Sequence, residues 1–321
     1  MPRPIAAGIY PLTEPLDGRR LTVVLLVGAR GVVLVDTGIA ATPARLVFPA
    51  LAALGLRPGD IRAVVITHSD VDHSGGLGAV LSAAPAATAI AHRLDVPWIE
   101  EVERLIDERY RGLRHAHGID QGAEFLDWVR ESDSRGVVHI GVVGGETLRL
   151  DDGRELELVH VPGHSRGHLA VVDTVTRTGL IGDAVFGAVT PSLDGSGASA
   201  PGYYDVAAYR GAVARLQELR LERLVGAHYP LLEGEEVEAF LAESAVFCTR
   251  LEASVLEALD ASSAPLTTRA VIAAAAPAVR AWPEEADLSL CAAVTGHLTD
   301  LHERGLVELL PGSPVAWAGR R

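Results

Sequence analysis

Short apolar runs separated by polar turns dominate the first part of the chain. Residues 21 to 27 and residues 31 to 35 are rich in valine and leucine, and the glycine-bounded segment between them predicts a hairpin. A helical pattern follows from residue 43 to residue 54, and a further apolar run covers residues 63 to 66. The pattern therefore predicts β-strands with a helix placed between them.

Histidine and aspartate follow several of these apolar runs directly. The positions concerned are Asp36 after residues 31 to 35, His68 to His73 after residues 63 to 66, His164 and His168 after residues 158 to 161, Asp183 after residues 179 to 182, and His228 after residues 223 to 227. Residues at the ends of successive strands can converge at one edge of a sheet, where loops shape a pocket. We therefore expect these side chains to meet.

The densest group lies in the stretch from Thr67 to Gly76. It places His68, Asp70, Asp72 and His73 within six positions. Like charges this close repel each other unless a cation neutralises them, so a metal site is the simplest interpretation. Neighbouring residues project in different directions, and one such turn can therefore serve two ions.

Composition and charge restrict the partners. All 28 basic residues are arginine, which excludes a lysine Schiff base and a P-loop lysine, and the formal net charge is -14. This charge makes nucleic acid and anionic membranes unlikely partners, because both require a basic surface. A membrane helix needs ~20 continuous apolar residues, and the sequence contains no such stretch. We expect a small-molecule substrate and leave a homodimer open.

The first residues and the two cysteines bear on the cellular compartment. The N-terminal residues lack the apolar core of a secretory signal. Cys248 and Cys291 stand far apart, without the spacing of a redox or zinc motif, and are expected to be reduced. The sequence thus predicts a cytoplasmic protein.

Two changes of character suggest the domain organisation. Residues 97 to 134 are charged with apolar residues at helical spacing, and we expect a helical, lid-like insert there. Residues 1 to 245 would form the catalytic domain. Residues 246 to 321 would form a second domain of helices followed by a hairpin, which resembles a winged helix. This second domain has six arginines against nine acidic residues, so a packing, pocket-closing or dimerisation role is favoured over nucleic-acid binding.

The ordered motifs of residues 5 to 240 resemble the metallo-β-lactamase superfamily. Its signature is His-x-His-x-Asp-His after a strand, then a Pro-Gly-His turn, an Asp after Gly, and a final Gly-His or Ala-His. The matching positions are His68, Asp72, His73, His164, Asp183 and His228, and residues 36 to 38 match an early Asp-x-Gly turn. The resemblance implies an α/β fold, an αββα sandwich with the small C-terminal winged-helix-like domain appended.

The resemblance also implies two divalent metal ions and a set of seven ligands. His68, Asp70 and His164 would hold the first ion, Asp72, His73 and His228 the second, and Asp183 would bridge them. A metal-bridging hydroxide would attack the substrate, and Asp72 would be the catalytic residue that orients it and returns a proton to the leaving group.

Further residues are expected to surround these ligands. Asp36 and His168 would support them through hydrogen bonds. Tyr203, Tyr204 and His117 are weaker candidates for substrate contacts. The remaining histidines, including His297, are expected to be ordinary surface or core residues.

Asp70 departs from the family signature, which usually has histidine there. Flavodiiron relatives have a carboxylate at this position, and oxygen ligands favour harder ions than imidazole does. Zinc is the expected metal, with iron or manganese as alternatives. Three aspartates and a hydroxide would balance two divalent ions, whereas a histidine at position 70 would leave a charge of +1.

Three functions are compatible with this sequence. The favoured one is a dinuclear metal-dependent hydrolase of a small ester, thioester or lactone. The second is a metallo-nuclease acting on RNA through the winged-helix-like domain. The third is a non-hydrolytic di-iron redox or binding protein, which Asp70 alone supports.

Overall fold

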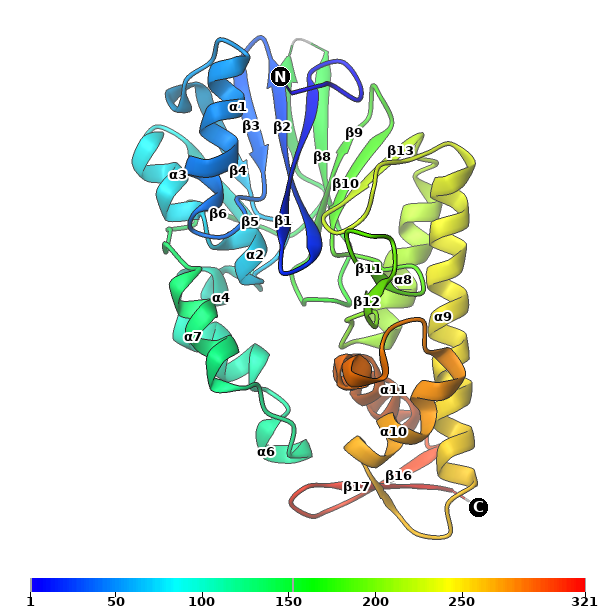
Figure 1. The fold of residues 1–321 in the computed structure, drawn as a ribbon. Helices are drawn as coiled ribbons and strands as arrows, with labels where there is room; N and C mark the ends of the chain where they lie inside the picture. The colour runs from blue at the N-terminus through cyan, green and yellow to red at the C-terminus, as the bar shows by residue number, and fades with distance from the viewer. Residues whose placement is uncertain (1, 152, 321) are drawn as a thin grey trace.

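Two six-stranded sheets packed face to face form the centre of the molecule (Figure 1). The structure is a computed structural model that describes residues 2–151 and 153–320. The first sheet has the order β1 (Ile9–Leu16), β2 (Arg19–Gly28), β3 (Gly31–Val35), β4 (Ile61–Val65), β5 (Thr88–His92) and β6 (Ile140–Val142). The second has the order β14 (Leu232–Glu233), β13 (Arg223–Gly226), β10 (Thr178–Gly182), β9 (Leu169–Asp173), β8 (Arg154–His160) and β7 (Thr147–Asp151). The predicted turn between β7 and β8 includes residue 152, which lies outside the described residues.

The strands β2, β3 and β9 are mostly apolar and buried because both faces of their sheets are covered. In β2, Leu25 packs toward the outer helices while its neighbours Val24 and Leu26 pack between the sheets. Successive side chains of a strand point to opposite faces, so a strand buried on both faces needs apolar residues at every position. The chain therefore forms a sandwich with helices outside.

The outer helices complete the αββα layers. On the first sheet lie the π-helical turn η1 (Pro43–Val47), α1 (Phe48–Ala53) and α3 (Leu77–Ala83), with the short 3-10 turn η2 (Pro58–Asp60) and α2 (Val71–Ser74) nearby. On the second lie α8 (Val206–Glu218) and the first half of α9 (Glu235–Asp260). A small ribbon of β11 (Thr190–Pro191) and β12 (Gly197–Ser199) lies beside them. These layers confirm the predicted fold class.

The predicted helical insert connects β5 and β6 of the first sheet and consists of several short helices. They are α4 (Val96–Glu100), α5 (Val102–Leu105), the π-helical turn η3 (Ile106–Tyr110), α6 (Arg114–His117) and α7 (Ala123–Glu131). Val102, Ile106, Leu126 and Val129 form its own small apolar core with Val71. The insert lies below the sandwich in Figure 1, on the side of α2.

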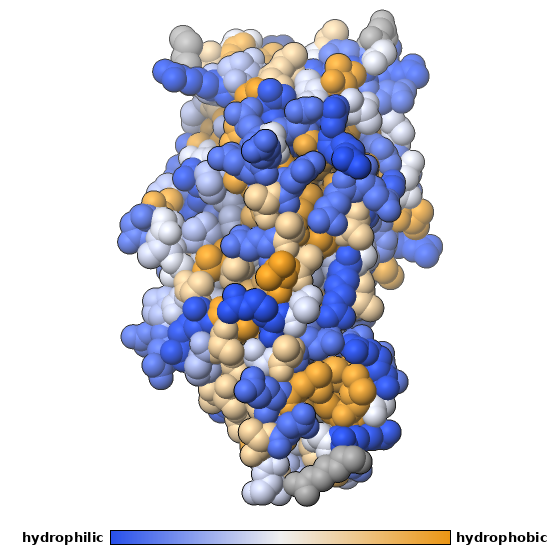
Figure 2. Space-filling view, turned by 90° about the vertical axis from the view of Figure 1, so that its right-hand side faces the viewer, coloured by the Kyte–Doolittle hydropathy of each residue, from blue (hydrophilic) through white to orange (hydrophobic). Residues whose placement is uncertain are grey.

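The C-terminal segment packs on the sandwich through one long helix. It contains the second half of α9, β15 (Leu266–Thr267), α10 (Thr268–Val279), the 3-10 helix η4 (Glu284–Leu290), α11 (Cys291–Glu303), β16 (Val307–Leu310) and β17 (Ala316–Gly319). The three strands form a sheet of order β15-β17-β16. Figure 2 shows apolar side chains gathered toward the lower end of this face of the molecule.

The proposed domain boundary at residue 245 falls inside α9, which continues unbroken from Glu235 to Asp260. One apolar core also runs from the second sheet through Phe247 and Leu251 to Leu298 and Trp317. The change in composition near residue 245 therefore marks no break in the backbone. Among the described helices, none is both long and apolar enough to cross a membrane.

Candidate metal centre

The predicted ligands meet at one edge of the two sheets. The turn from Thr67 to His73 follows β4, His164 follows β8, Asp183 follows β10 and His228 follows β13, while Asp36, a predicted supporting residue, follows β3. Among the described residues, two groups of ligating atoms lie within 4.8 Å of one another: His68, His164 and Asp183 form one, and Asp72, His73 and His228 the other. Strand ends thus bring together residues up to 160 positions apart in the chain.

All four histidines of these groups are held in the same way. In each ring Nδ1 faces an oxygen: Thr67 Oγ1 at 3.1 Å from His68, Asp36 Oδ2 at 2.8 Å from His73, the Gly202 carbonyl beside His164, and the Arg20 carbonyl at 2.7 Å from His228. An oxygen acceptor at Nδ1 keeps the proton there and leaves Nε2 with a free lone pair. Each ring therefore presents Nε2 to the centre, as metal-binding histidines do.

Several buried atoms at this edge lack the partner that burial demands. In the described part of the chain, His73 Nε2 and Asp183 Oδ1 are buried without any hydrogen bond. His68 Nε2 and His164 Nε2 lie only 3.2 Å apart. Two lone pairs that face each other at this distance, together with unpartnered buried atoms, call for a cation. The residues thus fit divalent metal ions, with imidazole and carboxylate donors that zinc, iron and manganese all accept.

Asp183 lies between the two groups. Its Oδ2 is 3.1 Å from His228 Nε2 and 3.7 Å from His73 Nε2, although its ligating atoms also fall within the group of His68 and His164. Burial acts to raise the pKa of this carboxyl, but the imidazoles of His228 and His73 hold it well below its usual value. Asp183 is therefore an anion placed where both groups can share it.

The second group shows how strongly the carboxylates attract positive charge. Burial acts to lower the pKa of His73, yet the carboxylates of Asp72, Asp36 and Asp183 raise it well above its usual value. The pKa of His228 is also raised against the effect of burial, by Asp183 and Asp72. Protons and metal ions compete for such nitrogens, so metal binding here should weaken as the pH falls.

Two buried residues, Asp36 and His168, form hydrogen bonds close to the predicted ligands. Asp36, in a left-handed backbone conformation with φ 58, accepts hydrogen bonds from the Thr67 amide at 2.7 Å and from the Thr67 hydroxyl at 2.8 Å. His168 Nε2 accepts a hydrogen bond from the Asp183 amide at 3.1 Å, and its ring stacks on His68 with centroids 4.6 Å apart. Both residues therefore contact the segments that contain the predicted ligands.

Asp70 has a partner that the sequence did not predict. Its Oδ2 lies 2.9 Å from His164 Nε2 and 3.3 Å from His68 Nε2, as a ligand of the first ion would. However, the buried guanidinium of Arg109 donates hydrogen bonds to both carboxylate oxygens of Asp70. Its Nε donates to Oδ1, and its Nη2 donates to Oδ2 at 2.7 Å. Burial acts to raise the pKa of Asp70, and Arg109 holds it well below its usual value. Asp70 thus belongs to an ion pair.

Arg109 reaches the centre from the turn η3 of the insert. Its Nη1 also donates to the His164 carbonyl at 3.0 Å, and the adjacent Tyr110 hydroxyl accepts a hydrogen bond from the Val71 amide at 3.0 Å. The insert is thereby attached to the turn that contains the predicted ligands. The available signal in the sequence was an arginine three positions after Ile106, on the apolar face of a helical pattern.

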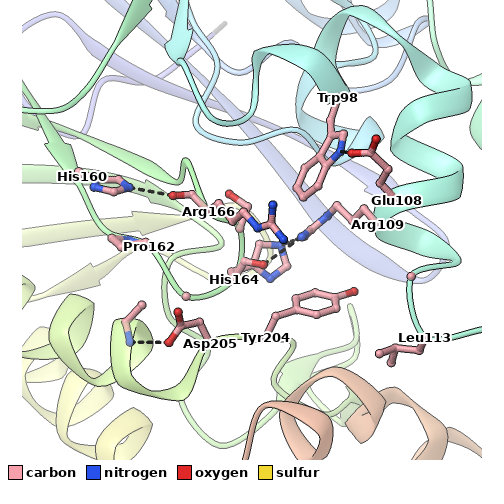
Figure 3. A pocket seen from close by; sticks show the side chains of 14 residues that line it. Trp98, Glu108, Arg109, Leu113, His160, Pro162, His164, Arg166, Tyr204 and Asp205 are labelled. Carbon is pink, nitrogen blue, oxygen red and sulfur yellow. Dashed lines mark hydrogen bonds between the residues drawn. The ribbon is translucent and has the colours of Figure 1, made fainter. Parts of the chain in front are cut away.

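A cavity of about 560 Å³ opens beside His164 (Figure 3). Trp98 and Leu113 from the insert and Tyr204 from the loop before α8 form its apolar walls. The Arg109 guanidinium carbon lies 5.0 Å from the centre of the Tyr204 ring, and that of Arg166 lies 5.7 Å from the Trp98 ring. The cavity therefore joins the candidate centre to aromatic and cationic walls.

Of the three weaker candidates for substrate contacts, only Tyr204 lines this cavity. Tyr203 is 0% exposed, and its hydroxyl bonds His297 Nε2 at 3.0 Å, so its assignment to the pocket is wrong. His117 bonds Thr268 Oγ1 at 2.8 Å and thus joins the insert to α10, away from the cavity lining. Adjacent tyrosines point to opposite sides, which the sequence pattern did not resolve.

A family model for the metallo-beta-lactamase superfamily matches residues 17–228. The chain belongs to the metallo-beta-lactamase superfamily. This match covers most of the sandwich, from β2 to β13, and every predicted ligand described above. The resemblance in the sequence is thereby confirmed.

Relatives and solved structures agree with this membership. A probable metallo-hydrolase of Mycobacterium tuberculosis is 34% identical over 138 residues, which are 41% of this chain and 40% of that protein. The acyl-coenzyme A thioesterase MBLAC2 of Gallus gallus is 28% identical over 73% of this chain and 82% of its own length. The chain thus spans well under half the length of the mycobacterial relative.

Two solved structures share the fold over nearly the whole chain. A metallo-beta-lactamase family protein of Thermus thermophilus superposes with a TM-score of 0.75 at 23% identity, covering 98% of this chain and 100% of its own. A beta-lactamase domain protein of Burkholderia ambifaria gives 0.74 at 17% identity, covering 99% and 93%. At these identities the likeness concerns the fold alone.

Proposed function

We propose that this protein is a dinuclear metal-dependent hydrolase of a small acyl thioester, with esters and lactones as related substrates. The observation that carries this proposal is the set of four histidines that present Nε2 to shared carboxylates. The thioesterase named among its relatives supports the thioester over the other acyl groups. The cavity of about 560 Å³ beside His164 has room for a small acyl group.

The assignment of ligands follows the sequence interpretation. His68, Asp70 and His164 would serve the first ion, Asp72, His73 and His228 the second, and Asp183 both. Divalent ions at these positions would supply a nucleophile from water near neutral pH and polarise the acyl oxygen. Zinc is the proposed metal, and iron or manganese are the alternatives.

The side chains of this chain would supply orientation and proton transfer. Asp72 is partly exposed and lies with its Oδ2 3.5 Å from His228 Nε2, so it can reach both the centre and a bound substrate. We assign it the orientation of water and the return of a proton to the leaving group. Trp98, Leu113 and Tyr204 would hold the acyl group and exclude water from one side.

A nuclease is disfavoured by charge and by packing. The C-terminal segment has the strand order β15-β17-β16 and helices that we interpret as a winged-helix-like module. Its helix α11 is buried against the catalytic part: a Cβ on Gly296 would lie 2.4 Å from the Tyr204 carbonyl. A helix used in this way is not free to enter a nucleic-acid groove. We propose that the module holds the pocket wall.

The test is hydrolysis by protein purified without added metal, with its metal content measured first. A panel of acyl thioesters, aryl esters, lactones and RNA should show turnover of thioesters, loss of activity with a chelator, and recovery with zinc. Asp72→Asn should abolish turnover, while His139→Gln, which alters an exposed histidine outside the centre, should leave it unchanged. Turnover that resists chelation, or RNA as the preferred substrate, would refute the proposal.

A further inference from the structure

The two metal positions differ in one neighbour, the guanidinium of Arg109. We propose that Arg109 acts as a resident positive charge at the first position, so that metal fills the second position first and the first position more weakly. This inference rests on the proposed function only in taking both positions as metal sites. It concerns the order and strength of loading.

Arg109 already occupies the lone pairs that a first ion would use. Its Nη2 lies 2.7 Å from Asp70 Oδ2 and 3.0 Å from His164 Nε2. His164 Nε2 is an acceptor, because its Nδ1 faces the Gly202 carbonyl. One guanidinium nitrogen therefore contacts two of the three groups assigned to the first ion. A metal ion that binds there must replace Arg109 in both contacts. It would also remain close to the positive charge of the guanidinium, which repels it.

Arg109 is also fixed, so it cannot withdraw freely. It is buried, donates to the His164 carbonyl at 3.0 Å, and lies against the rings of Tyr204 and Trp98 at 5.0 and 5.9 Å. The hydrogen bond from the Val71 amide to the adjacent Tyr110 at 3.0 Å anchors the same turn. Removing the guanidinium from the first position would break several of these contacts at once.

Among the described residues, no guanidinium forms a hydrogen bond or an ion pair with Asp72, His73 or His228, and Arg19 acts on His228 only as a more distant charge. Asp72, His73 and His228 contact each other, Asp183, Asp36 and the carbonyl of Arg20. Its buried His73 Nε2 is left without a hydrogen bond in the described part of the chain. Excess negative charge and a ring nitrogen without a hydrogen-bond partner favour this position for the first equivalent of metal.

The same pair explains how aspartate can stand where the family has histidine. Asp70 and Arg109 together carry no net charge, as a neutral histidine does. The first position thus keeps the charge of the usual family site while gaining an arginine beside it. Without Arg109, the negative charge of Asp70 would no longer be neutralised, and the first position would bind a metal ion more tightly.

The experiment is a zinc titration by calorimetry of metal-free full-length protein, with metal content measured by mass spectrometry after dialysis. The wild type should bind two zinc ions in steps at least about tenfold apart. In Arg109→Met the weaker step should tighten by about 10- to 100-fold, which brings the steps together. Arg130→Met, a matched change at a surface ion pair with Glu103 in the same insert, should behave as the wild type.

The possible outcomes of the titration distinguish this inference from the proposed function. Two equal steps in the wild type would overturn the inference even if Arg109→Met failed to fold, and would leave the proposed hydrolase intact. Loss of zinc in a folded Arg109→Met protein would show that Arg109 positions Asp70 for the metal and does not compete with it. A wild type that binds no metal would refute both this inference and the proposed function.

Discussion

The two groups of ligating atoms use the same side-chain types and differ in what surrounds them. Around Asp72, His73 and His228 the carboxylates outnumber the cations, and the pKa of His73 is raised. Around His68 and His164 the Arg109 guanidinium is present, and burial with the neighbouring His73 lowers the pKa of His68. The affinity of a metal site therefore depends on the charge of the neighbouring residues as well as on the identity of the donor atoms.

The most severe test of the comparison is to remove what the two groups share. Asp183→Ala should lose metal from both positions and bring hydrolysis to the background of the assay, because we propose that this carboxylate serves both ions. Metal content and turnover should be measured on the same preparation. Full metal content in this variant would refute the bridging assignment.

A second change should separate the two positions. Asp70→Ala removes a ligand of the first ion and leaves Arg109 without its carboxylate, so the first position should empty while the second keeps its metal. We expect metal content to fall from two ions to one in zinc-saturated protein. Asp120→Ala, which breaks a surface ion pair of the insert with Arg111, is the control. Two retained ions in Asp70→Ala would make Asp70 a bystander.

A buried histidine outside the candidate centre, His297, differs from His73 and His228 in the direction of its pKa shift. Burial lowers the pKa of His297 in α11 to about 4, from the usual 6.5. Because the folded pKa is depressed, neutral His297 stabilises the fold above pH 6.5, and this contribution is lost as the pH falls from 6.5 toward 4. The loss amounts to about 3 kcal/mol.

His297→Gln should therefore lose stability less steeply than the wild type between pH 6.5 and 4. Urea unfolding of both proteins at several pH values measures the difference, and the titration of the ligand histidines cancels in the comparison. Parallel stability curves would show that His297 does not titrate in this way.

The smallest effect on metal binding is expected for His168, which contacts the predicted ligands. His168→Ala removes the acceptor of the Asp183 amide and the ring stacked on His68, so zinc affinity and turnover should each fall by about 10- to 100-fold. His302→Ala, in the C-terminal segment, should change neither quantity. Complete loss of metal in His168→Ala would instead make His168 a ligand.

The local sequence was sufficient to predict which histidines and aspartates converge, but not which residues surround them. The ligands follow strand ends, and strand ends of a sandwich meet at an edge, so the order of motifs predicted which residues converge. Arg109 is 39 positions from Asp70 and reaches it only through the packing of the insert, which no local pattern encodes. Likewise, the burial of Tyr203 beside exposed Tyr204 depends on α11, and α9 runs through the expected domain boundary.

Whether Arg109 makes the two metal positions unequal can be seen in a crystal grown with one equivalent of zinc per chain. Anomalous scattering at the zinc edge would then show which position is filled. We expect a strong peak among Asp72, His73 and His228, and a weaker one beside His68 and His164, where Arg109 remains paired with Asp70. Two equal peaks, or a single peak at His68 and His164, would contradict this expectation.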